Sequence, residues 1–177
     1  MAKSFAERMI GAAMLDVATY EEVEADVSAT SQAAGVVAIV AVASAIGALH
    51  GGTGAIIGGI VSAFLGWLLW AGLTYLVGTK AFNGTATWGE LLRTLGFAQA
   101  PGVLAVLGIV PVLGGVIRFV VMIWLLVTGV IAIRQALDFD TGKAILTALI
   151  AWVVIIVVGI VVGLFGAAVM GMGALVH

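Results

Sequence analysis

The chain has 177 residues, of which 63% are hydrophobic and 9% are charged; its mean hydropathy is +1.29 and its formal net charge is -2. These few charged residues would not cover a soluble globule of this length, so the composition predicts an integral membrane protein. The small net charge gives no reason to expect a nucleic-acid partner. The lack of cysteine excludes disulfides, thiolate metal sites and a cysteine nucleophile.

The length of the apolar runs predicts an all-α fold. A helix needs about 20 apolar residues to cross a hydrocarbon core of about 30 Å, and several runs here are that long. A membrane β-barrel would show short segments of alternating polarity, whereas residues 153–162 carry no polar side chain. The 25 glycines suit a membrane bundle, where small residues let helices approach closely. We expect a polytopic membrane protein with a bundle of five transmembrane helices, preceded by a short amphipathic segment.

Residues 1–32 are predicted to form this N-terminal segment on the cytoplasmic side. Over residues 1–13, apolar side chains recur at helical spacing on one face, which predicts an amphipathic helix. The apolar face carries Met1, Phe5, Met9 and Ala12, with Ala6 and Ile10 beside them, and the polar face carries Lys3, Ser4, Glu7, Arg8 and Gly11. This helix either lies on the bilayer surface or packs against its own bundle. A secretory signal is not expected, because acidic residues follow the short apolar stretch.

A second short helix is expected to begin at Tyr20, because Thr19 with Glu22 three residues later matches a capping box. An acidic run follows the cap, and a solvated helix face explains it better than a bound cation or a basic partner. The run consists of Glu21, Glu22, Glu24 and Asp26. Residues 28–32 are predicted to form a polar linker whose hydroxyl groups cap the next helix.

Five spans are expected in the membrane domain, which covers residues 33–177. They are predicted at residues 33–49, 55–77, 95–110, 112–133 and 144–170. Small residues recur at every fourth position in the second span (Gly54, Gly58, Ser62 and Gly66) and again in the fifth (Gly159 and Gly163). Such stripes favour close helix packing, either within the bundle or between copies of the chain. A glycine stripe that lines a conduit is the alternative.

The third apolar segment is preceded by a helix that begins at Trp88. Thr87 is placed to cap this helix, and Glu90 lies in its first turn, where the helix dipole favours an acid. Arg93 follows three residues later, a spacing at which it can pair with Glu90. We expect this helix to lie half submerged at the membrane surface.

Pro101 and Gly102 then break or kink the path, so residues 95–110 form a short segment that either crosses the membrane or dips in and returns. If it crosses, nearly all lysines and arginines fall on one side of the membrane: Lys3, Arg8, Lys80, Arg93, Arg134 and Lys143. The positive-inside rule therefore favours five spans, with the N-terminus in the cytoplasm and the C-terminus outside. Pro111 is expected to open the next helix.

Arg118 lies in the fourth span, about 10 Å from its outer end at 1.5 Å per residue. It either contacts an anionic substrate or a lipid phosphate, or it anchors the helix at the interface or pairs with polar atoms in the bundle. In the loop that follows, Asp140 or Thr141 is expected to cap the last helix, with Lys143 in its first turn. Asp138 and Asp140 together would form only a weak site for a divalent ion.

Catalytic patterns are missing from the sequence. The two histidines, His50 and His177, are isolated, and neither a phosphate loop nor a nucleophile elbow occurs. The glycines after His50 fall in a loop between two spans rather than between a strand and a helix, so they do not predict a nucleotide site. We therefore expect neither an enzyme nor a cofactor.

Several motifs resemble the Yip family of Ypt/Rab-interacting proteins in its prokaryotic form. They are TWGELLR at residues 87–93, GFAQAP at residues 96–101, Pro111, Trp124, IAIRQAL at residues 131–137 and TGKA at residues 141–144. The resemblance implies a cytoplasmic N-terminal segment and five helical spans. Eukaryotic members of the family are associated with vesicle traffic, Rab GTPases and membrane shaping. Their long acidic N-terminal segment is reduced here to about residues 1–32, so GTPase binding is not expected.

Our leading hypothesis is a non-enzymatic protein of membrane organisation or trafficking-type interaction, located in the cell (inner) membrane if the source is prokaryotic. Its partners would be membrane lipids, a second copy of the chain or another membrane protein. The candidate contacts on the cytoplasmic face are Trp88, Glu90, Arg93, Gln99, Asp138, Asp140 and Lys143. The alternative is a small transporter, channel or lipid-translocating protein that uses Arg118 and the broken third span.

Overall fold

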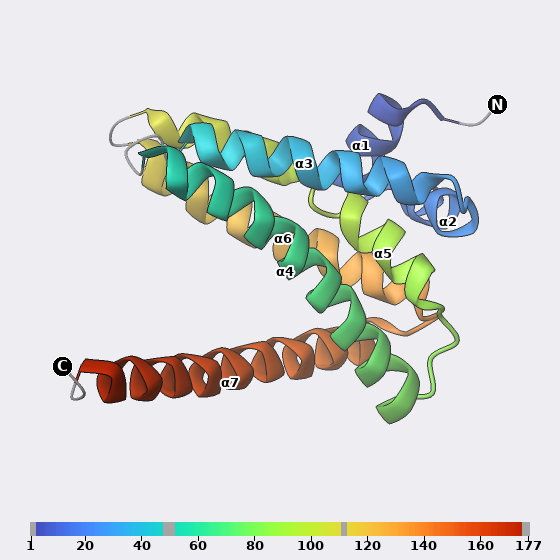
Figure 1. Cartoon of the computed structure of the whole chain (residues 1–177). Coiled ribbons are helices and arrows are strands. Elements are labelled where there is room, and N and C mark those ends of the chain that lie inside the picture. Colours follow the sequence, from blue (N-terminus) through green and yellow to red (C-terminus); the bar gives the residue numbers. More distant parts are fainter. Residues whose placement is uncertain (1–2, 48–51, 111–112, 175–177) are drawn as a thin grey trace.

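The computed structural model describes residues 3–47, 52–110 and 113–174, and only the backbone of residues 52–56 and 162–174 (Figure 1). Its elements are α1 (Phe5–Ala13), α2 (Val17–Ala25), α3 (Ala29–Gly47), α4 (Gly52–Ala81), α5 (Trp88–Phe97), the 3₁₀ helix η2 (Ala100–Ile109), α6 (Leu113–Ala136) and α7 (Thr141–Ala174). No strand occurs in these ranges, which confirms the all-α prediction.

Five segments of the described chain are long and apolar enough to cross a membrane. They are Ala29–Gly47, Ile57–Ala81, Trp88–Ile109, Leu113–Ala136 and Thr141–Val161. Many of their large apolar side chains are exposed, for example Leu65 at 61% and Val116 at 61%, as expected for helices that face lipid. The chain is therefore a multi-pass helical membrane protein.

The spans run back and forth between two ends of the bundle, which we name by their residues. The N-terminal face carries α1, α2 and the starts of α3, α5 and α7; the Gly47 face carries the ends of α3 and η2 (Figure 1). α3 packs closely against η2, and α6 packs against η2 from another side. α7 contacts α4 and α6 near the N-terminal face, and its later half diverges from them (Figure 1).

The third span is built from two kinds of helix. It begins at Trp88 rather than at residue 95, because α5 is largely buried within the bundle instead of lying half exposed. After α5 the chain continues as a 3₁₀ helix, in which the Gly102 nitrogen donates to the Gln99 carbonyl at 2.8 Å. A 3₁₀ helix rises about 2.0 Å per residue against 1.5 Å in an α-helix, so this short segment spans a greater depth than α-helical geometry predicts.

Other predicted boundaries differ from the observed ones at the N-terminal segment. α2 begins at Val17 with Asp16 as its N-cap, so the predicted cap at Thr19 is wrong; Thr19 lies inside the helix, and its hydroxyl donates to the Asp16 carboxylate at 2.7 Å. α3 begins at Ala29, so most of the predicted linker belongs to the first span. Pro111, predicted to open the fourth span, lies outside the described residues.

The predicted glycine stripes do not pack against the chain's own described helices. A Cβ added at Gly58, Gly66 or Gly159 would meet no atom within 4 Å. The surroundings of Gly54 and Gly163 lie outside the described side chains, and packing between copies of the chain stays a prediction. Close helix contacts form elsewhere: a Cβ at Gly96 would lie 2.7 Å from the Ala33 Cβ.

Gly96→Ala is expected to destabilise the protein by about 1–3 kcal/mol, because the added methyl group forces α3 and α5 apart. Gly72→Ala is the matched control: it also lies in a span, a Cβ there meets no atom within 4 Å, and alanine favours a helix. Unfolding of both variants in detergent micelles checks this. Equal stability of the two variants would contradict the close α3–α5 contact.

Candidate functional site

The first two helices form a cap on the N-terminal face, and a buried arginine holds the cap together. Arg8, predicted on the polar face of α1, is only 3% exposed. Its guanidinium lies 2.9 Å from the Glu22 carboxylate and 2.8 Å from that of Asp26, and it donates to the Gln32 side chain at 3.1 Å. Part of the predicted solvated acidic run therefore neutralises a buried cation. We refer to residues 5–25, which comprise α1, α2 and the turn between them, as the N-terminal cap.

A second buried arginine fastens the N-terminal cap to the bundle. Arg93 in α5 is 5% exposed, and its guanidinium donates to the Val23 carbonyl at 2.9 Å and to the Glu24 carbonyl at 3.0 Å. These carbonyls end α2, where they have no partner inside the helix and where the helix dipole attracts a cation. The predicted Glu90–Arg93 pair does not form, because the Glu90 carboxylate accepts from the Thr87 nitrogen at 2.7 Å in a capping box.

The end of α1 is tied to the bundle in the same way. The Trp124 indole nitrogen in α6 donates to the Ala13 carbonyl at 2.7 Å, and the Tyr20 hydroxyl donates to the Ala12 carbonyl at 3.0 Å. Phe5 packs edge-on against Phe97, with ring centroids 6.3 Å apart. These contacts confirm one predicted alternative for α1, packing against its own bundle.

Three large apolar side chains of the N-terminal cap are exposed, and we refer to them as its apolar side. Ile10 is 64% exposed, Met14 69% and Val17 38%. Trp124 lies 12 residues before the end of α6, about 18 Å along the helix, so its bond to Ala13 places the end of α1 beside the spans rather than above them. Contact between this exposed apolar side and lipid stays a prediction.

Of the remaining residues predicted on this face, most have local structural contacts. Asp140 caps α7 as predicted, accepting from the Lys143 nitrogen at 3.0 Å, and the Asp138 carboxylate accepts from the Thr85 hydroxyl at 2.9 Å. The Lys143 ammonium lies 5.6 Å from the centre of the Phe139 ring. Trp88 remains 48% exposed. No group of three possible metal-ligating side chains occurs in the part of the chain that the structure describes.

Glu24 is the carboxyl group of the N-terminal cap with the most altered titration. Its pKa is raised to about 7, mainly by partial burial and also by the negative charges of Glu90, Asp138 and Glu21, while Arg93 opposes the shift. These neighbours come from α5, from the loop between α6 and α7 and from α2 itself. The docking of α2 therefore brings acidic groups together around a half-buried carboxyl.

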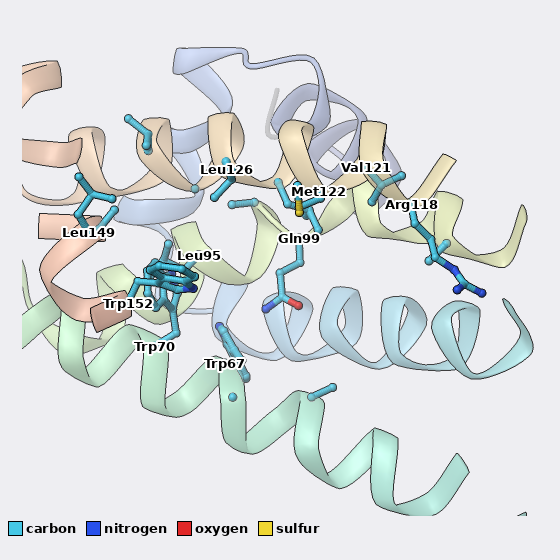
Figure 2. Close-up of a pocket in the computed structure, with 18 of the residues that line it drawn as sticks. Trp67, Trp70, Leu95, Gln99, Arg118, Val121, Met122, Leu126, Leu149 and Trp152 are labelled. Atoms are coloured by element: carbon cyan, nitrogen blue, oxygen red, sulfur yellow. The ribbon is translucent and has the colours of Figure 1, made fainter. Parts of the chain in front are cut away.

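A groove of about 930 Å³ opens between α4 and α6 (Figure 2). α5 and η2 contribute its floor, and the start of α7 closes one end. Its walls are largely apolar and include Trp67, Trp70, Gln99, Arg118, Leu126 and Trp152. Sequence reasoning did not predict this groove, because its walls come from segments far apart in the chain.

Arg118 lies at one end of this groove, and Gln99 lies between it and the tryptophans at the other end (Figure 2). Arg118 lies toward the Gly47 face, and its guanidinium donates to the Gly47 carbonyl at 3.2 Å. Gln99 points into the groove between α4 and α6 (Figure 2). The prediction that Gln99 belongs to the face with Trp88 is therefore wrong: η2 carries the chain into the bundle at this residue.

Five apolar spans with a docked helical cap at one end define a polytopic helical membrane protein. The sequence matches the Yip1 domain over residues 12–173, nearly the whole chain, so the chain belongs to the Yip1 domain family. This finding confirms the resemblance seen in the sequence motifs. No curated protein and no solved structure matches the chain.

Arg93→Met is expected to release α2 from the bundle, because two carbonyl groups lose a charged donor worth about 1.5–3 kcal/mol. Limited proteolysis in detergent should then cut the N-terminal cap faster than in the wild type. Arg134→Met is the control, since Arg134 is exposed on α6. A cap that resists the protease equally in both variants would contradict the anchoring role of Arg93.

Glu24 predicts a pH dependence of cap docking. A carboxyl whose pKa rises on folding, here from 4.5 to about 7, stabilises the folded state at low pH and loses this effect as the pH rises through that window. Protection of the α2 amides from hydrogen exchange, corrected for intrinsic rates, should fall between about pH 4.5 and about pH 7. Glu24→Gln should remove this fall. If the Glu24→Gln variant kept the same pH response, the pH dependence of amide protection would belong to other groups.

Proposed function

We propose that this protein organises the membrane without catalysing a reaction, by inserting its N-terminal cap into one leaflet. The observation that carries the proposal is the combination of a firmly attached cap with an exposed apolar side formed by Ile10, Met14 and Val17. An amphipathic helix buries such a side among lipid headgroups and upper acyl chains. Arg93 and Trp124 bind the N-terminal cap to the spans. Insertion of the cap therefore enlarges the cross-section of the protein in one leaflet only.

This arrangement supports a wedge-shaped molecule. The N-terminal face holds two additional helices beside the spans, and the Gly47 face holds none among the described residues (Figure 1). A protein with more cross-section in one leaflet favours bending of the bilayer toward that leaflet. Membrane lipids are thus the first partners that we propose.

For the orientation, we propose that the N-terminal face lies in the cytoplasm and the C-terminus outside, in the cell (inner) membrane of a prokaryotic source. The distribution of basic residues supports this, since all lysines and arginines except Arg118 lie before or in α1, in α5 or at the ends of spans next to the N-terminal face. Contact between copies through the exposed Gly58 and Gly159 positions would concentrate these wedges.

The test uses purified protein reconstituted into large vesicles, imaged by electron cryomicroscopy. The wild type is expected to produce narrow or tubular vesicles, and the double variant Ile10→Ser/Met14→Ser to lose most of this effect. The matched control is Val116→Ser/Val120→Ser, which changes two exposed apolar residues with the same spacing on α6. If both double variants shape vesicles like the wild type, the cap is not the wedge.

A second candidate is translocation of lipid, which the placement of Arg118 in an apolar groove favours. Proteoliposomes would then move a labelled lipid between leaflets, and Arg118→Ala would slow the movement. No movement in the wild type would eliminate this candidate and leave the wedge proposal unaffected.

A further inference from the structure

The groove between α4 and α6 has its charge at one end. Arg118 is the one ionisable side chain on its described walls, and it lies toward the Gly47 face, while Trp70 and Trp152 lie toward the other end (Figure 2). The guanidinium group has five N–H donors in a planar fork, and the single hydrogen bond found for it among the described residues is the one to Gly47. Its remaining donors have no hydrogen-bond partner among the described residues, and the side chain is exposed.

The chain supplies no acidic side chain near Arg118. No aspartate or glutamate occurs between Glu90 and Asp138, so all of α6 lacks one, and α3, α4, η2 and α7 lack one as well. Asp138 follows Arg118 by 20 residues, about 30 Å along a helix. A cation at membrane depth is costly unless an anion or a polar group compensates it. The Gly47 carbonyl supplies one polar partner, and an anion that pairs with the remaining donors would come from outside the described residues.

The dimensions of the groove fit one chain of a phospholipid. Its lining on α6 runs from Arg118 to Val130, about 18 Å at 1.5 Å per residue. One leaflet contributes about half of a hydrocarbon core of about 30 Å, so an acyl chain has a similar length. A transmembrane helix, about 10–12 Å wide with its side chains, would need a broader and more continuous seat. The volume of about 930 Å³ lies within the range of sites for small molecules.

We propose that this groove binds a phospholipid from the leaflet at the Gly47 face, with its phosphate on the Arg118 guanidinium and an acyl chain along α6 toward Trp152. Charge selects the lipid: a headgroup without a positive charge leaves the phosphate free to pair with arginine, so phosphatidylglycerol binds better than phosphatidylcholine. This site is separate from the N-terminal cap, which lies at the other face, so either proposal can fail alone.

The experiment measures quenching of tryptophan fluorescence in nanodiscs of phosphatidylcholine. A small fraction of lipid carries bromine on its acyl chains, either as phosphatidylglycerol or, in a parallel sample, as phosphatidylcholine. Trp67, Trp70 and Trp152 line the groove and report on a brominated chain inside it. At equal low fractions, brominated phosphatidylglycerol is expected to quench the wild type several-fold more than brominated phosphatidylcholine.

Two independent variants test the two ends of the site. Arg118→Gln should abolish the preference for phosphatidylglycerol, whereas Arg118→Lys should keep part of this preference. Arg134→Gln is the control: it removes a charge at the other end of α6 and should leave the preference unchanged. Gly66→Leu should reduce the preferential quenching by filling the groove, because a Cβ at Gly66 has open space. Gly159→Leu is its control, since Gly159 also has open space but does not line the groove.

Three results would overturn the proposal. One is equal quenching by the two brominated lipids in the wild type, and another is an undiminished preference in Arg118→Gln. The third is a Gly66→Leu variant that keeps the quenching preference but loses chemical crosslinking between copies, which would make the groove an interface between protomers. Circular dichroism and size-exclusion chromatography of each variant establish that it is folded.

Discussion

The carbonyl groups at the end of a helix have no partner within that helix, and beside lipid there is little water to supply one. The structure meets this need repeatedly with side chains from other helices. Arg93 binds the end of α2, Trp124 binds the end of α1, and Arg118 binds the end of α3. The Thr128 hydroxyl donates to the Ala98 carbonyl after α5 at 2.8 Å. Each bond joins elements distant in the chain, so these carbonyl groups determine how the helices assemble.

This constraint shapes the two regions to which we assign proposed roles. At the N-terminal face, donors from α5 and α6 hold the cap so firmly that its unused apolar side stays directed outward. At the Gly47 face, Arg118 has no acidic partner in the chain, and the small side chains along α4 leave a groove open beside it. The proposed wedge in one leaflet and the proposed lipid site in the other are compatible, because the N-terminal cap and the groove lie at opposite faces of the bundle.

Composition and motif spacing predicted much of the fold. Apolar run lengths indicated five spans, and the caps at Thr87 and Asp140 depend on residues only three positions apart. The same local reasoning failed where a residue had a distant partner. Thr19 and Glu22 match a capping box, yet Asp16 caps α2 because Glu22 binds Arg8. Glu90 and Arg93 have the spacing of an ion pair, but the Arg93 guanidinium instead donates to the Glu24 carbonyl near the end of α2.

By itself the sequence determined that the chain is a helical membrane protein of this family, because hydropathy and short-range spacing are properties of neighbouring residues. Only the tertiary structure decided that Arg8 and Arg93 are buried, that Gln99 lies in a groove, and that Gly58 and Gly66 are left without a partner in the bundle. Burial and open space depend on which helices meet. These helix contacts depend in part on hydrogen bonds between residues far apart in the chain, such as Ala13 and Trp124, which are 111 positions apart.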